Sequence, residues 1–388
     1  MRNAAVATLN AARPQTPPVP PPGVQQQRPW APAPAPVLPA RPAARRPLGG
    51  IGVLQLVSWQ LAVLAVVLGL GQRWAVFGTV VGCALLVVGC TAVRVRGRWL
   101  YEWLILAVKY ALRHYEDDLR DPSGSGRALV KVLSPEAVSL VHNVGDEPVF
   151  MLSRITGITA VLRPDDGVRE LAVPAPEVLL PPHEESFTAQ VIHHAGLGQD
   201  RPLRTWIALQ AMRTIDVYTD TEVRQTLGNA LRRVRRRLHR SGLPTETLPE
   251  NEFFGTLASL AHVTADRGRV REDWRFFYSG PVSQAVFRLG DWSRLSAAAS
   301  PQLLRRLLTA TPYAAVTIAV SACRSVDAEP EVDAALRLAA ADPAALEHAA
   351  TVLTQVAGEW AVTMTRLDGR HGHGLAITLP LGLQVSGD

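Results

Sequence analysis

Two long apolar runs near the start of the chain give way to short alternating and helical segments. The runs are Ile51–Leu70 and Trp74–Val93, and neither contains a charged side chain. A helix rises about 1.5 Å per residue, so about twenty apolar residues span roughly 30 Å, the thickness of a bilayer's hydrocarbon core. We therefore predict a transmembrane helical hairpin over residues 50–94, with its turn at residues 71–73.

Arginine residues flank both outer ends of this hairpin. Residues 1–50 carry six arginines and no acidic residue, and Arg94, Arg96 and Arg98 follow the second run. The positive-inside rule then predicts a multi-pass protein of the plasma membrane with both termini in the cytoplasm. A signal peptide is disfavoured, because the first run is too long, starts late and lacks a small-x-small cleavage site.

Three polar residues interrupt the first run: Gln55, Ser58 and Gln60. We expect them to face a neighbouring helix, where a side-chain hydrogen bond contributes about 0.6–2 kcal/mol.

The segments on either side of the hairpin differ in character. Residues 1–49 are rich in Pro and Ala, which predicts a disordered or polyproline-like cytoplasmic tail. Residues 95–127 are predicted to form a juxtamembrane amphipathic helix, Arg98–Tyr115, followed by a hydrophilic linker. Tryptophan and tyrosine suit the headgroup layer, although the same helix could instead pack on the soluble domain. The candidate interface and coupling residues are Arg98, Trp99, Tyr101 and Trp103.

Residues 128–388 carry the mixed pattern of a cytosolic α/β (α+β) domain. Period-2 patterns and turn residues predict strands, and apolar residues at helical spacing predict helices. The predicted strands are Val149–Ser153, Ile158–Leu162, Ala189–His194, Arg204–Leu209, Trp274–Tyr278, Val282–Leu289, Tyr313–Ala322, Ala334–Ala339, Trp360–Arg366 and Leu375–Leu379. The predicted helices are Thr221–Arg240, Asn251–His262 and Asp342–Val356.

Two sections of this domain share an outline of strand, long helix and strand, namely Thr205–Pro249 and Tyr313–Leu367. The outline suggests an internal duplication, although the residues themselves do not repeat.

Composition adds little specific chemistry. The net charge of +6 comes almost wholly from arginine, since Lys109 and Lys131 are the only lysines, and an arginine excess of this kind need not indicate nucleic acid. The cysteines Cys83, Cys90 and Cys323 do not form a disulfide scaffold and fit a reducing compartment.

The sequence lacks the familiar catalytic motifs. It has no GxxxxGK[ST] phosphate loop, which argues against an ATPase or GTPase. It also contains no HExxH, zinc-spaced cysteine set, GxSxG elbow or DxD. We assign no catalytic, cofactor-binding or metal site. The histidines considered for a metal are His183, His193, His194, His371 and His373. Adjacent histidines on a strand point to opposite faces, so His193 and His194 do not suit one mononuclear site.

A cluster of arginines and a cluster of aromatic residues each have a structural and a functional interpretation. The arginines of the long helix lie opposite Leu231, Val234 and Leu238, which favours a solvated charged face over contact with anionic lipid or an acidic partner. No nucleic acid is expected, since no aromatic stacking pattern accompanies them. The candidate contact residues are Arg232, Arg233, Arg236, Arg237 and Arg240, beside Arg235. The aromatic residues from Trp274 to Tyr278 favour core packing over partner docking.

The order and spacing of several segments resemble the EccE family, membrane subunits of the actinobacterial type VII (ESX) secretion system. The resemblance runs from about Leu48 to Gly382. It rests on the apolar hairpin, Val95–Trp103 after it, Arg204–Leu209, the long helix ending in Gly242-Leu243-Pro244, Trp274–Gly280, Asp342–Leu346, Arg366–Gly369 and Leu379–Gly382. Residues 120–200 resemble the family only loosely.

This resemblance implies a non-catalytic structural subunit. Its two membrane helices would anchor a cytosolic α/β domain that contacts EccB-, EccC- and EccD-like subunits and membrane lipid, without a cofactor. EccC-like proteins supply the motor ATPase, which agrees with the missing phosphate loop. Two alternatives remain: a membrane-tethered transferase-like enzyme with an assembled site, and an adaptor that binds anionic lipid or nucleic acid through Arg232–Arg240.

Overall fold

The computed structural model describes residues 53–95, 98–111, 116–119, 124–165, 173–181, 185–198, 202–264, 268–325 and 328–385. The predicted proline-rich tail over residues 1–49 and His183 lie outside these residues.

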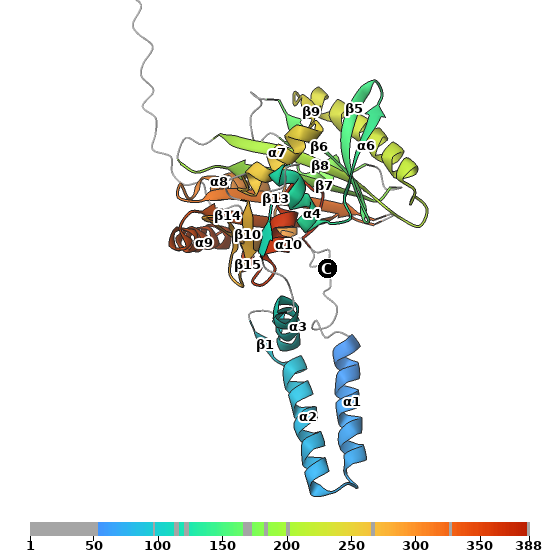
Figure 1. Cartoon of the computed structure of the whole chain (residues 1–388), viewed down its shortest axis with the longest axis vertical. Coiled ribbons are helices and arrows are strands. Elements are labelled where there is room, and N and C mark those ends of the chain that lie inside the picture. The colour runs from blue at the N-terminus through green and yellow to red at the C-terminus, as the bar shows by residue number, and fades with distance from the viewer. Residues whose placement is uncertain are drawn as a thin grey trace, which may run out of the picture. The chain divides into compact units, whose positions relative to one another are not determined.

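The two apolar runs form helices of different length. Helix α1 covers Val53–Gly69 (17 residues) and α2 covers Trp74–Ala92 (19 residues), joined by a turn at residues 70–73 (Figure 1). Among the described residues, α2 alone is long and apolar enough to cross a membrane. At about 1.5 Å per residue, α1 covers about 25 Å, short of the roughly 30 Å hydrocarbon core. The predicted pair of spanning helices, and with it a multi-pass topology, is therefore not confirmed.

The juxtamembrane segment is more varied than a single helix. Strands β1 (Arg94–Val95) and β2 (Arg98–Trp99) pair with each other, and helix α3 follows over Leu100–Ala111. The helix predicted from Arg98 therefore begins at Leu100, because Arg98 and Trp99 belong to the small ladder. The predicted linker also contains a strand, β3 (Glu116–Asp118), which belongs to the main sheet.

A 13-stranded sheet organises the rest of the chain, and all of its strand pairs are antiparallel. Its order is β3-β10-β11-β12-β14-β13-β7-β8-β6-β5-β4, with β15 beside β12 and β9 beside β6. The strands not yet named are β4 (Val138–Val144), β5 (Glu147–Arg154), β6 (Gly157–Pro164), β7 (Phe187–Ala195), β8 (Leu203–Met212), β9 (Thr245–Thr247), β10 (Arg269–Glu272), β11 (Phe277–Ser279), β12 (Val282–Gly290), β13 (Ala315–Arg324), β14 (Glu331–Ala340) and β15 (Thr363–Arg366). The chain is thus a mixed α/β protein with a large antiparallel sheet.

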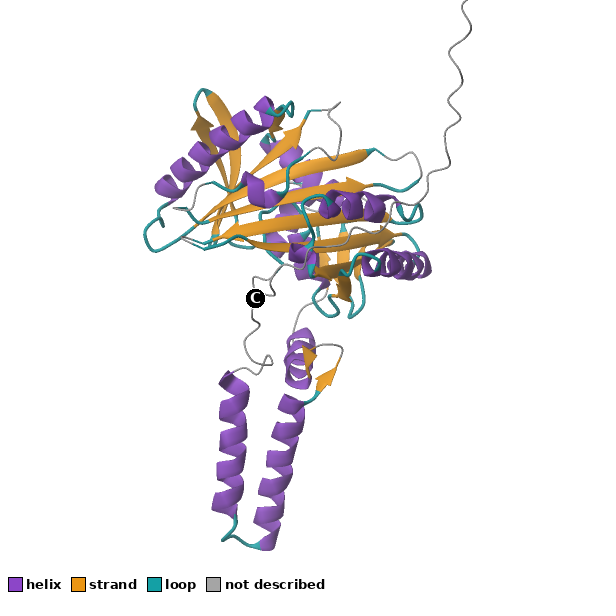
Figure 2. Ribbon diagram, turned by 180° about the vertical axis from the view of Figure 1, so that it is seen from behind, coloured by secondary structure: helices purple, strands orange, loops and turns teal. Residues whose placement is uncertain are grey.

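Helices cover both faces of this sheet (Figures 1 and 2). One face carries α4 (Ser125–Leu133), α7 (Glu250–Leu260) and α10 (His371–Ile377). The other carries α5 (Pro176–Leu179) and α6 (Asp220–Arg240) over one half, and α8 (Ala299–Thr309) and α9 (Pro343–Gly358) over the other. Because both faces are covered, central strands such as β13 are buried along most of their length, and alternate residues enter different cores.

The sheet is built from two halves of the same topology. Outward from the central pair β7 and β13, the strands β8, β6, β5 and β4 match β14, β12, β11 and β10. In the first half, β8 is followed by the long helix α6 and the short strand β9, which pairs with β6. In the second half, β14 is followed by the long helix α9 and the short strand β15, which pairs with β12. The suggested duplication thus has a structural counterpart, with β8–β9 corresponding to β14–β15. The second predicted section was one strand too long, because it also included β13.

Side chains cap the first turns of two long helices. Asp342 caps α9 by accepting hydrogen bonds from the backbone of Ala344 and Ala345, with proline at the first helical position. Helix α6 begins with a capping box between Thr219 and Glu222.

Other sequence expectations were wrong. Residues 375–379 were predicted as a strand, but 375–377 belong to helix α10. A helix fits there because Gly374 packs against Val286 so closely that a Cβ would lie 2.7 Å from it, which brings α10 down onto β12. Strands β11 and β15 begin at Phe277 and Thr363, later than predicted. Strand β4 and helix α8 were not predicted.

Candidate functional site

Three aromatic rings join helix α3 to the sheet domain. The Trp103 ring centroid lies 5.9 Å from that of Trp274, and the Tyr110 ring meets Trp274 edge-on at 5.2 Å. Trp103 and Tyr110 are two helical turns apart and therefore share one face of α3 with Leu106, which is only 4% exposed. We call Trp103, Tyr110 and Trp274 the aromatic junction.

The face of α3 away from the junction is also apolar. Leu104, Ile105 and Val108 are each about half exposed, at 50%, 50% and 52%. A helix whose second apolar face is uncovered has a further apolar surface to meet, and a membrane surface is one such environment.

Gly369 holds the Trp274 ring in place from the domain side. Its backbone N–H donates to the Trp274 carbonyl at 2.7 Å, and its φ of +71° lies in the left-handed region that favours glycine. A Cβ at this position would lie 2.8 Å from the Trp274 ring. No other residue type therefore fits this turn without moving the ring.

Gly369→Ala is accordingly expected to destabilise the domain by about 1–3 kcal/mol, from left-handed strain and displacement of Trp274. Urea unfolding in detergent micelles, followed by tryptophan fluorescence, measures this loss. Gly358→Ala is the matched control, because Gly358 ends α9 and a Cβ added there would meet no atom within 4 Å. Equal stability of the two variants would contradict the role given to Gly369.

Arg366 anchors the segment that carries Trp274. Its guanidinium forms an ion pair with Glu347 at 2.7 Å, donates to the Arg275 carbonyl at 2.8 Å and lies over the Phe276 ring at 4.8 Å. Arg275 also pairs with Glu347, at 2.8 Å. The residue next to Trp274 is therefore tied to helix α9.

A second connection runs through the backbone. Strand β3 follows α3 and pairs with the domain strand β10, placing Asp118 opposite Arg269 and Glu116 opposite Arg271. Opposite charges at directly paired positions favour this register. The chain that leaves α3 thus adds a strand to the sheet, so the domain contacts the juxtamembrane segment at two separate places.

The structure distributes the predicted coupling residues over different elements. Trp103 is in the aromatic junction, whereas Arg98 and Trp99 lie in the β1–β2 ladder and Tyr101 lies in the first turn of α3. Desolvation, with the neighbouring Glu102 carboxylate, raises the pKa of Tyr101. Sequence reasoning missed Tyr110 and Gly369. The spacing of seven residues from Trp103 to Tyr110 was the signal for the first.

Several arginines of α6 form ion pairs or hydrogen bonds with other parts of the domain. Arg233 pairs with Glu185 at 3.1 Å, Arg235 with Glu147 at 2.5 Å, and Arg237 donates to the Val178 carbonyl. Arg232 and Arg236 bond to groups of their own helix, and Arg240 makes no ion pair with the described residues. These contacts give several of the candidate arginines a structural role.

The histidines and a buried arginine form internal contacts. His193 Nδ1 lies 3.0 Å from the Thr205 hydroxyl, and burial lowers the pKa of His193 to about 4. His194, adjacent in β7, meets Thr317 at 2.9 Å instead. Arg337 is fully buried, donates to Gln284 Oε1 at 2.7 Å, and has its pKa lowered to about 9 by desolvation. Within the described residues, no group of three or more His, Cys, Asp or Glu is arranged to hold a metal ion.

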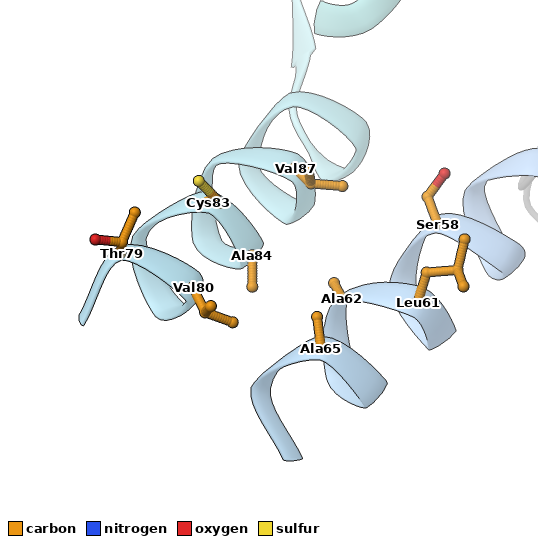
Figure 3. A pocket seen from close by; sticks show the side chains of 9 residues that line it. All are labelled: Ser58, Leu61, Ala62, Ala65, Thr79, Val80, Cys83, Ala84 and Val87. Atoms are coloured by element: carbon orange, nitrogen blue, oxygen red, sulfur yellow. The ribbon is translucent and has the colours of Figure 1, made fainter. Parts of the chain in front are cut away.

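Helices α1 and α2 are joined by polar contacts and bound a groove. The Gln55 side chain donates to the Thr91 carbonyl at 2.9 Å, and the Trp59 indole donates to the Thr91 hydroxyl at 2.8 Å. The groove has a volume of about 430 Å³ and lies between side chains of both helices (Figure 3). Its lining residues are Ser58, Leu61, Ala62, Ala65, Thr79, Val80, Cys83, Ala84 and Val87. Gln55 and Ser58 thus face the neighbouring helix as expected, whereas Gln60 is exposed.

These residues form a contact between helix α3 and the sheet domain. In comparisons with known proteins, the chain matches no family model and no curated protein sequence.

Proposed function

We propose that this chain is a non-catalytic structural subunit of a type VII (ESX) secretion membrane complex, similar to EccE. The observation that carries the proposal is the double connection between α3 and the domain, through the aromatic junction and through β3. A domain connected to its anchor at two places keeps a defined orientation to the membrane, which a subunit that contacts EccB-, EccC- and EccD-like neighbours needs.

In this proposal both α1 and α2 cross the plasma membrane. The contacts of Gln55 and Trp59 with Thr91 support a paired arrangement, because polar groups in hydrocarbon need partners within the protein. Helix α1 is only a few Å short of the hydrocarbon core, a mismatch that bilayer thinning or flanking residues accommodate at modest cost. Arginine on both outer sides supports a cytoplasmic location for the two termini.

Cysteine labelling tests this topology in intact cells. With the native cysteines replaced by alanine, a cysteine at Gln72 is expected to react with a membrane-impermeant maleimide, whereas a cysteine at Ser386 reacts only after lysis. The same labelling pattern at both positions would contradict two spans.

Recovery of the complex tests the function. We expect a tagged copy, extracted from its native cells in mild detergent, to migrate in a large particle that contains EccB-, EccC- and EccD-like proteins. The double variant Trp99→Glu with Trp103→Glu should reduce this recovery severalfold while the domain stays folded. Unchanged recovery of the complex would argue against the coupling role, and isolation of the native chain alone after crosslinking would argue against the complex.

A further inference from the structure

The two ends of the sheet differ although the halves share a topology. Strands β4 and β10 occupy equivalent outer positions. The outer side of β10 is covered by β3, which pairs with it at three positions. Among the described residues, β4 pairs with β5 alone, and no other backbone hydrogen bond reaches it.

Strand β4 has the properties of a receptive edge. Its seven residues, Val-Ser-Leu-Val-His-Asn-Val, include no proline, lysine or acidic side chain. In an antiparallel ladder, alternate residues direct their N–H and C=O groups away from the partner strand. Val138 and Val141 add apolar surface there, with exposures of 56% and 62%. Natural sheets usually protect an edge of this kind with charge, proline or a covering segment, because it can pair with another chain.

The strand is also firmly held in a position to accept a partner. It pairs with β5 at seven positions, and the two strands are joined by a tight turn at Gly145, whose φ is +72°. A preformed edge loses little conformational entropy when an extended segment binds to it.

Charge indicates what kind of segment fits. At the opposite end of the sheet, the basic residues of β10 face the acidic residues of β3. Strand β4 lies between Glu136 and Asp146, two exposed carboxylates, of which Glu136 also interacts electrostatically with the buried Arg154. A second copy is disfavoured, because antiparallel pairing centred on Val141 brings Glu136 of one copy close to Asp146 of the other at both ends.

We propose that the open edge of β4 binds an extended segment of another protein, with alternating apolar residues in its centre and basic residues at both ends. Backbone hydrogen bonds supply much of the affinity, and Glu136 and Asp146, which flank β4, select the partner. This inference rests on the sheet alone and does not depend on the proposed secretion role.

Synthetic peptides test the proposal on the full chain in detergent micelles. The probe is an eleven-residue peptide of alternating Val and Thr with two lysines at each end, compared with the same peptide carrying glutamates. We expect the lysine-ended peptide to bind at least about tenfold more tightly at low salt, with the difference shrinking at high salt. Hydrogen exchange should slow in residues 138–144 when it binds.

Two variants locate the binding. Val141→Lys should weaken binding of the lysine-ended peptide at least about tenfold, because it places a positive charge at the centre of the edge. Ile155→Lys is the matched control, since Ile155 is 74% exposed in the turn between β5 and β6 and the change in net charge is the same. Equal binding of the two peptides, no binding of either, or binding that survives Val141→Lys would overturn the proposal.

A photo-crosslinking residue at Ser139 checks the same edge in native cells. The expected adduct is a peptide of another protein with an apolar centre and basic ends, lost in Val141→Lys and retained in Ile155→Lys. An adduct to a second copy of this chain, together with a dimer in light scattering, would replace the proposal with self-pairing. Absence of any adduct at this position would also overturn it.

Discussion

Trp274→Ala is expected to separate α3 from the domain while leaving the sheet intact. The change removes both ring contacts of the aromatic junction, each contributing about 0.5–1.5 kcal/mol, and the burial of a large side chain. The total loss should be about 2–4 kcal/mol. Because about 1.4 kcal/mol corresponds to a factor of ten, hydrogen exchange in α3 should accelerate at least about tenfold where it proceeds by local opening.

Hydrogen exchange of the full chain in detergent micelles, followed by mass spectrometry of the peptide over residues 100–111, measures this effect. Trp74→Ala is the control, because Trp74 is 88% exposed at the start of α2 and is remote in sequence from the junction. Trp274→Phe should retain part of the protection. Unchanged exchange in α3 after Trp274→Ala would show that β3 alone holds the two parts together.

Acidification from pH 7.5 to pH 5 is expected to destabilise the domain by about 4 kcal/mol through two buried histidines. Burial lowers the pKa of His193 to about 4, and burial together with the Arg366 charge lowers that of His371 to about 3. In the unfolded chain both titrate near pH 6.5. The unfolded state therefore binds more protons below pH 6.5, and stability falls with pH until each folded pKa is reached.

At about 1.36 kcal/mol per pKa unit, each histidine accounts for about 2 kcal/mol of the loss at pH 5. Urea unfolding at a series of pH values measures it. His193→Gln and His371→Gln should each remove about half of the pH dependence between pH 7.5 and 5. His348→Gln, on the exposed side of α9, should leave it unchanged. A flat profile for the native chain would show that these histidines are accessible to protons in the folded state.

The sequence contained enough information for most of the sheet, because its inner strands carry strong apolar patterns. Strands such as β7, β8 and β13 combine β-branched residues with neighbouring turn signals, so their positions were predicted closely. Helices α6, α7 and α9 were predicted for a similar reason, since their apolar residues recur at helical spacing.

Elements fixed by tertiary contacts were harder to predict. Strand β4 carries Ser, His and Asn among its valines, so its pattern is weak until β5 is seen beside it. Helix α10 contains alternating glycines, which have low helix propensity, and it forms because it packs on β12. Strand β3 consists of three acidic residues and is stabilised by arginines more than a hundred residues later in the chain.

The candidate site was likewise predictable only where its residues stand in a strong local pattern. Trp103 was predicted as a coupling residue from its place after the second apolar run, whereas the aromatic residues around Trp274 were predicted to pack in the core. Their contact was not predictable, because it joins segments far apart in the sequence and depends on Gly369 leaving room for the ring. Strand alternation predicted opposite faces for His193 and His194, and their rings contact different residues, Thr205 and Thr317.

The duplicated topology has a consequence for the order in which the chain is made. The two halves meet along β7 and β13, where Val191 pairs with Val320 in the middle of the finished sheet. During synthesis the first half is complete long before β13 leaves the ribosome, and β7 is then an uncovered apolar edge. Closing such distant pairs is the slow step in sheets of this kind. Nascent chains stopped before residue 315 should therefore aggregate or recruit chaperones, whereas chains that extend past β14 should not.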